Sequence, residues 1–342
     1  MKRILTLIMI FLLFSLFGCL NISSEYTMAS TSDIVSDSPS STAYDTTYVT
    51  TSATSNETTS QVIEYDYFGE DLPFNEAIRF DPIGYSSDAQ WHWHGTPVFS
   101  PDGKEMFWSK YIHATDSIEI WYTVKSGETW GEASKFSIDG IDGFYNCPVF
   151  SHDGTELFFI NLNSLVFTIF KVTRSGDSWV NPEAIDLKIP EGKILGWSFS
   201  VSNNGNIYFL LWDLNGLEPQ KIYRSVYCNG EYGYPEVIKE LNTNSFGVGG
   251  PLIAPDESYI IFDSNQSGGL GMHDIYISFI NNLGDFSSPV NLGNQVNTSN
   301  EDTFASLSPD GLYLFYVSLK NTDQGFNPYW IKLAEIEVFK NR

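Results

Sequence analysis

The chain has 342 residues, of which 42% are hydrophobic and 15% aromatic, which is enough apolar material for a sizeable core. It carries 42 Asp and Glu against 18 Lys and Arg, giving a formal net charge of −24. Nucleic-acid binding requires clustered basic residues that neutralise phosphates, and the sequence contains no such cluster. The composition therefore excludes a nucleic-acid-binding protein, while the acidity alone does not determine the fold.

Residues 1–18 have the composition of a secretory signal peptide. Two basic residues follow the initiator methionine, and an apolar run over residues 4–17 comes next. This run is shorter than the ~20 residues that a membrane-spanning helix requires. The run ends in a Leu-Phe-Gly-Cys segment that resembles the bacterial lipobox, and the resemblance implies that Cys19 carries a diacylglyceryl anchor. An ordinary signal peptide with an incidental cysteine is the alternative.

Residues 19–66 form a second segment in which Ser and Thr dominate and no apolar period recurs. Such a composition cannot bury enough apolar surface to fold, so we expect a disordered tether behind the lipidated Cys19. The folded domain then covers residues 67–342. We expect it to be extracytoplasmic, monomeric and attached to a bacterial membrane through the lipid anchor only.

A strand, a tight turn and a second strand are predicted for residues 97–108. Pro101 presets φ for the first corner of the turn, Asp102 can accept hydrogen bonds from the backbone that follows it, and Gly103 accepts a positive φ. The hairpin recurs four more times, at steps of 51, 51, 52 and 54 residues. Its turn residues are Asp102, Asp153, Asn204, Asp256 and Asp310. Five hairpins at nearly even steps indicate an internal repeat.

Each of the first four repeats continues with a third strand, a glycine turn and a fourth strand that begins with an aromatic residue. Four antiparallel strands at this period describe a blade of an all-β propeller. The last repeat lacks its fourth strand, whereas residues 73–80 read as a fourth strand without a blade. The sequence therefore predicts a five-bladed β-propeller in which this N-terminal strand pairs with the last blade, because a closed ring leaves no open edge. Six blades are the alternative.

The Ser-Pro-Asp-Gly turns and the strand that begins Asp274-Ile275-Tyr276 resemble the TolB-type, WD-like β-propeller family over residues 67–342. The third repeat departs from the pattern with Asn203-Asn204, and the fourth has Glu257 in place of Gly. The resemblance implies the propeller fold and a secreted or periplasmic scaffold. A fold of this kind does not define a reaction.

The loops that lead into the innermost strands of a propeller converge at one face of its central channel. In this chain they bring aromatic and polar residues together, and aromatic faces stack on sugar rings while amides and carboxylates orient hydroxyl groups. We therefore expect a glycan or a protein partner to bind at this face. The candidate ligand-binding residues are Trp91, His92, His94, Tyr145, Asn146, Trp197, Glu301 and Asp302. The alternative is that the aromatic members pack between blades.

Two chemical alternatives use the same residues. His92 and His94 share one face of a strand and could bind a metal together with Glu301, but a hydrogen-bonding pair at the channel rim is the favoured interpretation. Glu301 and Asp302 are consecutive and face opposite sides of a strand, so they are not a catalytic pair for glycoside hydrolysis. We therefore assign no metal, no cofactor and no catalytic residue, and a polysaccharide hydrolase or lyase is the alternative function.

The two cysteines of the folded domain, Cys147 and Cys228, lie in different repeats and at different stages of the repeat. A disulfide between them is not favoured. No Cys-x-x-Cys pattern typical of a metal site occurs in the sequence.

Overall fold

The computed structural model describes residues 65, 67–82, 85, 95–112, 114–163, 166–242, 247–320 and 325–340. The chain divides into two compact units, 1–64 and 65–342, and every described element belongs to the second. The predicted signal peptide, Cys19 and nearly all of the predicted tether lie outside the described residues. The same holds for Trp91, His92 and His94.

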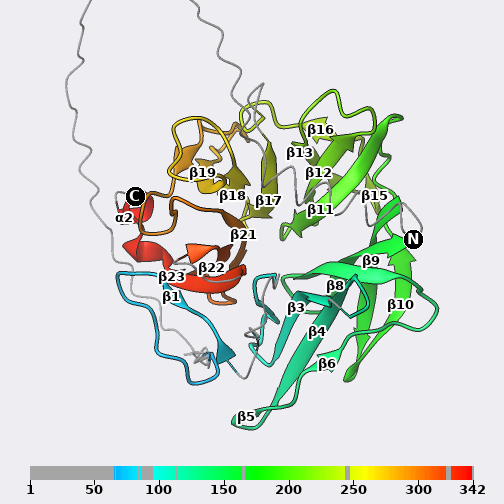
Figure 1. Cartoon of the computed structure of the whole chain (residues 1–342). Helices are drawn as coiled ribbons and strands as arrows, with labels where there is room; N and C mark the ends of the chain where they lie inside the picture. The colour runs from blue at the N-terminus through cyan, green and yellow to red at the C-terminus, as the bar shows by residue number, and fades with distance from the viewer. Residues whose placement is uncertain are drawn as a thin grey trace, which may run out of the picture. The chain divides into compact units, whose positions relative to one another are not determined.

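The described strands of residues 65–342 form five antiparallel blade sheets around a common centre and one small two-stranded hairpin (Figure 1). The first blade consists of β2 (Val98–Phe99), β3 (Glu105–Ile112), β4 (Ser117–Ser126), β5 (Thr129–Trp130) and β6 (Ser134–Lys135). The second consists of β7 (Phe144–Phe150), β8 (Glu156–Asn163), β9 (Val166–Ser175) and β10 (Ser178–Ala184). The third consists of β11 (Lys193–Val201), β12 (Ile207–Asp213), β13 (Lys221–Ser225) and β16 (Glu236–Val237), with a small hairpin of β14 (Tyr227–Cys228) and β15 (Glu231–Tyr232) between the last two.

The remaining two blades complete the ring. The fourth consists of β17 (Val248–Ile253), β18 (Tyr259–Ser264), β19 (Asp274–Phe279) and β20 (Val290–Asn291). The fifth consists of β21 (Asp302–Leu307), β22 (Tyr313–Ser318), β23 (Asn327–Lys332) and β1 (Ile78–Arg79). Two short helical turns follow, η3 (Leu333–Glu335) and α2 (Glu337–Lys340). In Figure 1, the strands β11, β17 and β21 lie nearest to the centre of the ring.

The N-terminal strand closes the ring as the sequence predicts. β1 pairs antiparallel with β23, with Ile78 opposite Trp330 and Arg79 opposite Tyr329. The amide of Phe80 then donates to the carbonyl of Pro328 at 2.9 Å. The five-bladed architecture is therefore confirmed, and its last blade is built from both ends of the folded domain.

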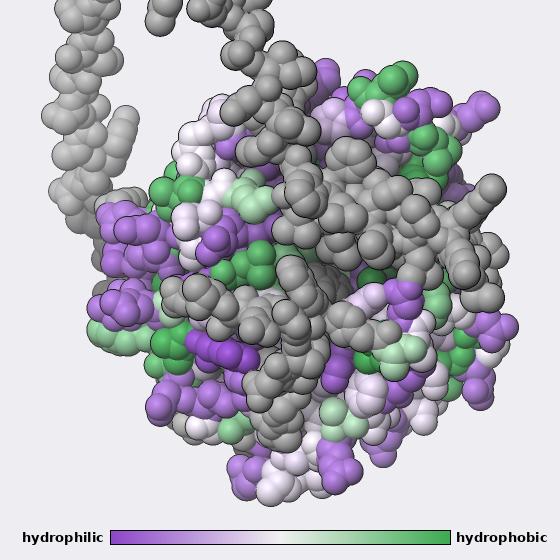
Figure 2. Space-filling view, viewed as in Figure 1, coloured by the Kyte–Doolittle hydropathy of each residue, from purple (hydrophilic) through white to green (hydrophobic). Residues whose placement is uncertain are grey.

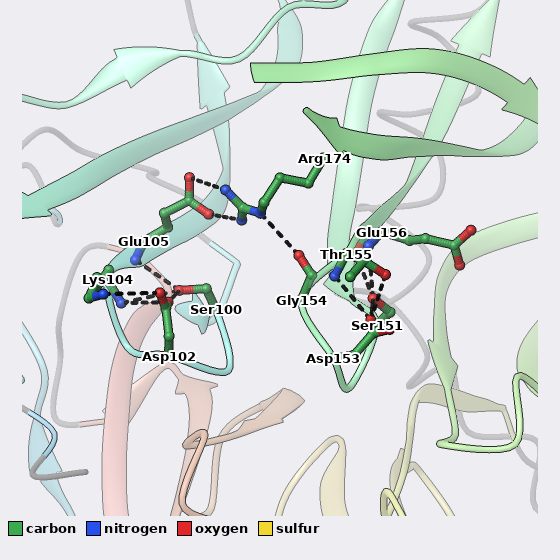
Figure 3. A network of polar contacts seen from close by, with 10 residues as sticks. All are labelled: Ser100, Asp102, Lys104, Glu105, Ser151, Asp153, Gly154, Thr155, Glu156 and Arg174. Carbon is green, nitrogen blue, oxygen red and sulfur yellow. Dashed lines mark hydrogen bonds and ion pairs between the residues drawn. The ribbon is translucent and has the colours of Figure 1, made fainter. Parts of the chain in front are cut away.

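Local side-chain hydrogen bonds shape the turns between the first two strands of the first, second, fourth and fifth blades. In the first blade, the Ser100 hydroxyl donates to Asp102 Oδ1 at 2.7 Å, and the Lys104 amide donates to the same oxygen at 3.1 Å. Gly103 takes a φ of 68°, which costs a residue without a side chain little. Ser151 and Asp153 repeat this arrangement in the second blade (Figure 3).

A bidentate ion pair links these two turns. The guanidinium of Arg174, on β9, pairs with Glu105, on β3, with Nη1 at 3.3 Å from Oε1. Its Nε donates to the carbonyl of Gly154 at 3.1 Å (Figure 3). One side chain therefore joins the turn of the second blade to the first blade.

The apolar core lies between the blades rather than at the axis. The buried apolar residues form five clusters, and each cluster joins two neighbouring blades. Phe107 and Phe159 pack between the first and second blades, while Phe80, Phe99 and Trp330 pack between the fifth and the first. Because each seam has its own core, the axis of the ring need not be filled with side chains.

Candidate functional site

A cavity of ≈ 470 Å³ lies between the innermost strands of all five blades. Small-molecule sites in proteins are typically concave, largely preformed and of about 300–1,000 Å³. The cavity extends along these strands from the level of Asn146 and Trp197 to the turns at Pro101, Pro255 and Pro309. It is therefore the principal candidate for a binding site in the described part of the domain.

Four of the inner strands that line this cavity contain β-bulges. The register of four of them shifts, between Asn146 and Val149, Leu195 and Phe199, Gly249 and Leu252, and Thr303 and Ser306. A bulge bends its strand and frees residues from the ladder. Three of the bulges contain a residue in the left-handed region, namely Cys147 (φ 55°), Gly250 (φ 44°) and Phe304 (φ 45°). All three line the cavity.

Hydrogen bonds between neighbouring blades fix the cavity wall. The Cys147 amide donates to the Ser109 hydroxyl at 2.9 Å, and the Ile253 amide donates to the Ser200 hydroxyl at 2.9 Å. The Ser306 hydroxyl donates to the carbonyl of Pro97 at 2.7 Å and so connects the fifth blade to the first. The wall is therefore preorganised, because these polar groups are satisfied without a ligand.

Two of the candidate residues, Asn146 and Trp197, meet at one end of the cavity. Asn146 Nδ2 donates to the backbone carbonyl of Trp197 at 3.0 Å across the seam between the second and third blades. The indole ring packs against Phe167 and Trp212, with centroid distances of 4.5 and 5.9 Å. Both Asn146 and Trp197 line the cavity, and the indole is only partly buried.

Tyr145 lies next to Asn146 in sequence but belongs to the seam core. Its ring contacts Phe136 and Phe159, and its hydroxyl donates to the carbonyl of Ile141 at 2.6 Å. Burial raises the pKa of this hydroxyl. Its placement corresponds to the alternative in which an aromatic residue packs between blades.

Glu301 and Asp302 lie at the seam between the fourth and fifth blades and do not line the cavity. Glu301 Oε1 is 3.2 Å from His273 Nδ1, and both side chains are largely buried. Asp302 is fully buried and accepts hydrogen bonds from the amide and the hydroxyl of Thr298, at 2.6 and 3.0 Å. Burial raises the pKa of Asp302.

Asp263, on β18, joins this seam and was not expected from the sequence. It is 6% exposed, and its Oδ1 accepts a hydrogen bond from the amide of Phe304 at 3.3 Å. A Cβ on Gly249 or Gly250 would lie 2.3 or 2.5 Å from its carboxylate oxygens, so both positions require glycine. Burial raises the pKa of Asp263 to about 6. The only sequence signal is a carboxylate at the end of an otherwise apolar strand.

The carboxylates at the seam between the fourth and fifth blades also affect the protonation of His273. Burial lowers the pKa of His273, but its hydrogen bond to Glu301 and the negative charge of Asp263 outweigh burial and raise it. His273, Asp263 and Glu301 come from two blades, so no local spacing in the sequence connects them.

Ser198 is a cavity residue that carries no distinguishing sequence pattern. It is 5% exposed and lines the cavity beside Trp197. Its hydroxyl has no hydrogen-bond partner among the described residues. Cys147 faces the same space, and burial raises the pKa of its thiol to about 12, so the thiol stays neutral at physiological pH.

Several further chemical features are defined by the structure. Cys147 and Cys228 are both free thiols. No group of three His, Cys, Asp or Glu side chains within the described ranges could hold a metal ion. Of the helices in the described part, none has the length and hydrophobicity to cross a bilayer.

The fold and the cavity define this domain as a five-bladed β-propeller with an axial, ligand-sized cavity. No protein-family model matches the sequence, and no curated protein matches it. Similar solved structures include TolB from Acinetobacter baumannii, with 18% identity, 70% of this chain and 54% of that chain covered, and a TM-score of 0.42. They also include a protein of unknown function from Dyadobacter fermentans, with 13% identity, 77% and 84% covered, and a TM-score of 0.48. A Hadza microbial sialidase has 10% identity, 75% and 68% covered, and a TM-score of 0.40.

This chain spans about half the length of TolB. The identities are so low that these similarities concern the fold alone.

Proposed function

We propose that the propeller is a binding module that holds a glycan in its axial cavity. The observation that carries the proposal is the placement of Trp197 and Asn146 together on the wall of a preformed cavity. An aromatic ring beside an amide is the pairing that sugar recognition uses, because the ring packs on the apolar face of a sugar while the amide orients its hydroxyl groups.

The shape of the site favours a glycan over a protein partner. Specific protein–protein interfaces bury about 800 Å² on each partner and are broad. The site here is a concave space of ≈ 470 Å³ enclosed by five inner strands. Such a space accepts a small ligand or the end of a chain.

The same geometry gives little support to a polysaccharide-active enzyme. Glycoside hydrolysis requires two carboxyl groups on opposite sides of one sugar bond. None of the described residues that line the cavity is Asp or Glu. Glu301, the carboxylate that the sequence placed at this face, is instead 3.2 Å from His273 at a blade seam.

A glycan array probed with the full-length protein and with Trp197→Ala tests the proposal. We expect the wild type to bind a defined set of glycans and Trp197→Ala to lose roughly tenfold or more in affinity. Tyr234→Ala is the matched control, because Tyr234 is 78% exposed and does not line the cavity. Near- and far-ultraviolet circular dichroism verifies that each variant is folded. Equal binding by Trp197→Ala and the wild type would refute the proposed site.

We further propose that Cys19 anchors the protein to a bacterial membrane as a lipoprotein. The lipobox-like segment before Cys19 and the Ser/Thr-rich segment after it support this placement. The wild type should incorporate radiolabelled palmitate and sediment with membranes, whereas Cys19→Ser should do neither. Retention of the label by Cys19→Ser would rule the anchor out.

A further inference from the structure

We infer that the axial cavity selects an uncharged sugar that presents hydroxyl groups to Ser198 and Asn146, and that it rejects anionic glycans. The inference rests on the proposed function and adds the chemical class of the ligand. It is based on two features of the described cavity wall. The wall contains no Asp, Glu, Lys or Arg, and it leaves the Ser198 hydroxyl and Asn146 Oδ1 available for hydrogen bonds.

The described lining of the cavity contains no Asp, Glu, Lys or Arg, and its one described histidine is the exposed His152 in the turn of the second blade. This is notable in a chain of net charge −24. Figure 2 shows hydrophilic residues over much of the periphery of the domain, with hydrophobic residues in separate patches. The Asp, Glu, Lys and Arg side chains of the described domain therefore lie outside the cavity wall, and no Lys or Arg of that wall is available to pair with an anion.

The backbone of the wall is also poor in donors for an anion. Pro148 and Pro251 occupy equivalent positions in the inner strands β7 and β17, line the cavity and carry no N–H group. The amides of Cys147 and Ile253 already donate to serine hydroxyls of the neighbouring blades. An anion that entered the cavity would lose its hydration without gaining an ion pair with Lys or Arg, which is unfavourable.

The buried carboxylate of Asp263, behind the cavity wall, further disfavours anionic ligands. Asp263 lies against Gly250 and accepts a hydrogen bond from the amide of Phe304. Gly250 and Phe304 both line the cavity, so the Asp263 carboxylate is separated from it by a single layer of backbone. When ionised, this carboxylate repels a negative ligand and leaves a neutral one unaffected.

Two polar groups of the cavity wall, the Ser198 hydroxyl and Asn146 Oδ1, are available to form hydrogen bonds with the hydroxyl groups of a ligand. The Ser198 hydroxyl is buried and has no partner among the described residues. Asn146 uses its Nδ2 to bind the Trp197 carbonyl, which leaves Oδ1 as an acceptor. A sugar hydroxyl can donate to Asn146 Oδ1 while another donates to or accepts from Ser198, so both groups are satisfied by a neutral saccharide.

Ser198→Ala and Ser202→Ala form a matched pair for testing this inference. Both serines are 5% exposed, and both hydroxyls lack a partner in the described part of the chain. Ser198 lies within β11 and Ser202 directly follows that strand, but only Ser198 lines the cavity. Removing an unpaired hydroxyl should leave either variant folded, so a difference in binding reports on the cavity alone.

The probes are cellobiose, maltose, lactose and chitobiose as neutral sugars, with cellobiouronic acid and sialyllactose as the acidic counterparts. Calorimetric titration of the full-length protein should show binding of at least one neutral probe and binding of its acidic counterpart at least about tenfold weaker. Ser198→Ala should weaken neutral binding about 3- to 10-fold, and Ser202→Ala should leave it unchanged.

Two results would overturn the inference. If acidic and neutral probes bind the wild type equally, or if Ser198→Ala binds as tightly as Ser202→Ala, the selectivity is absent while glycan binding itself stands. If the wild type binds no glycan on the array and no probe in the calorimeter, the proposed function fails and the inference fails with it.

Discussion

The replacement Asp263→Asn should stabilise the protein at neutral pH, although it removes a charged group from a polar cluster. Two titratable groups act on Asp263, namely His273 and Glu301, and Asp274 acts in turn on His273. Both Glu301 and Asp274 are carboxylates, so His273 alone can compensate the negative charge of this group. Burial dominates, and it raises the pKa of Asp263 from 3.8 to about 6.

The sign of the effect follows from proton linkage. The folded state keeps the Asp263 proton up to a pH of about 6, whereas the unfolded chain releases it at about 3.8. The protonated Asp263 carboxyl therefore contributes its full stabilisation of the folded state below pH 3.8. This stabilisation decreases as the pH rises and is lost above pH 6. Each pKa unit corresponds to about 1.4 kcal/mol, so ionisation of Asp263 costs the folded state about 3 kcal/mol at pH 7. The raised pKa of His273 changes stability in the same direction.

Urea unfolding followed by tryptophan fluorescence between pH 4 and pH 8 measures this effect. Asparagine keeps the Oδ1 acceptor for the Phe304 amide but does not ionise. We expect Asp263→Asn to be more stable than the wild type by about 1–3 kcal/mol at pH 7. The gain can be smaller than the full cost of ionising Asp263, because the variant also loses an anion that stabilises protonated His273. The two proteins should be nearly equal in stability at pH 4.

The control is Asp139→Asn, which changes an exposed carboxylate in the loop before β7. It should leave the pH profile of the wild type unchanged. If Asp263→Asn is instead less stable than the wild type at pH 7, the carboxylate is a net stabilising partner of His273. The burial argument would then be refuted.

Three further changes test the ring itself. Phe80→Ala removes a fully buried ring between β1 and the first blade and should cost about 3–5 kcal/mol in urea unfolding. Arg174→Lys keeps the charge but loses the bidentate geometry at Glu105, so a loss of about 1–2 kcal/mol is expected, and no loss would mean that the pair is solvent-screened. Gly249→Ala places a Cβ 2.3 Å from Asp263 Oδ2 and should lower the melting temperature. Gly233→Ala is the control, because its Cβ would lie no closer than 3.6 Å to a neighbouring atom, and it should leave the melting temperature nearly unchanged.

The fold was predictable because its determinants are local and repeated. The hydrogen bonds of Ser100 and Asp102 form within one turn, so the residues that make the turn are adjacent in sequence. Closure by residues 73–80 followed from counting strands, since a ring with one missing strand and one spare strand has a single solution. The observed pairing of Ile78 with Trp330 supplies the register, which no count of strands could give.

The candidate site was harder to predict because it depends on bulges and on neighbouring blades. Tyr145 and Asn146 are consecutive, yet the first packs in a seam and the second faces the cavity. Which of two neighbours faces the axis depends on strand register, and a bulge changes it. Ser198 was missed because a serine within a strand has no distinguishing pattern until its hydroxyl is found buried and unpaired.

The separation of the seam cores from the axial cavity has a functional consequence. Stability in this ring comes from five apolar clusters, each shared by two blades, while the cavity wall is held by hydrogen bonds such as that from Ser306 to Pro97. A substitution that faces only the cavity therefore removes little packing, and the ligand preference can change without loss of the fold. Trp197 is the informative intermediate, because it lines the cavity and also packs on Phe167. If the seams and the cavity are energetically separate, Ser198→Ala should change affinity without changing stability, whereas Trp197→Ala should change both.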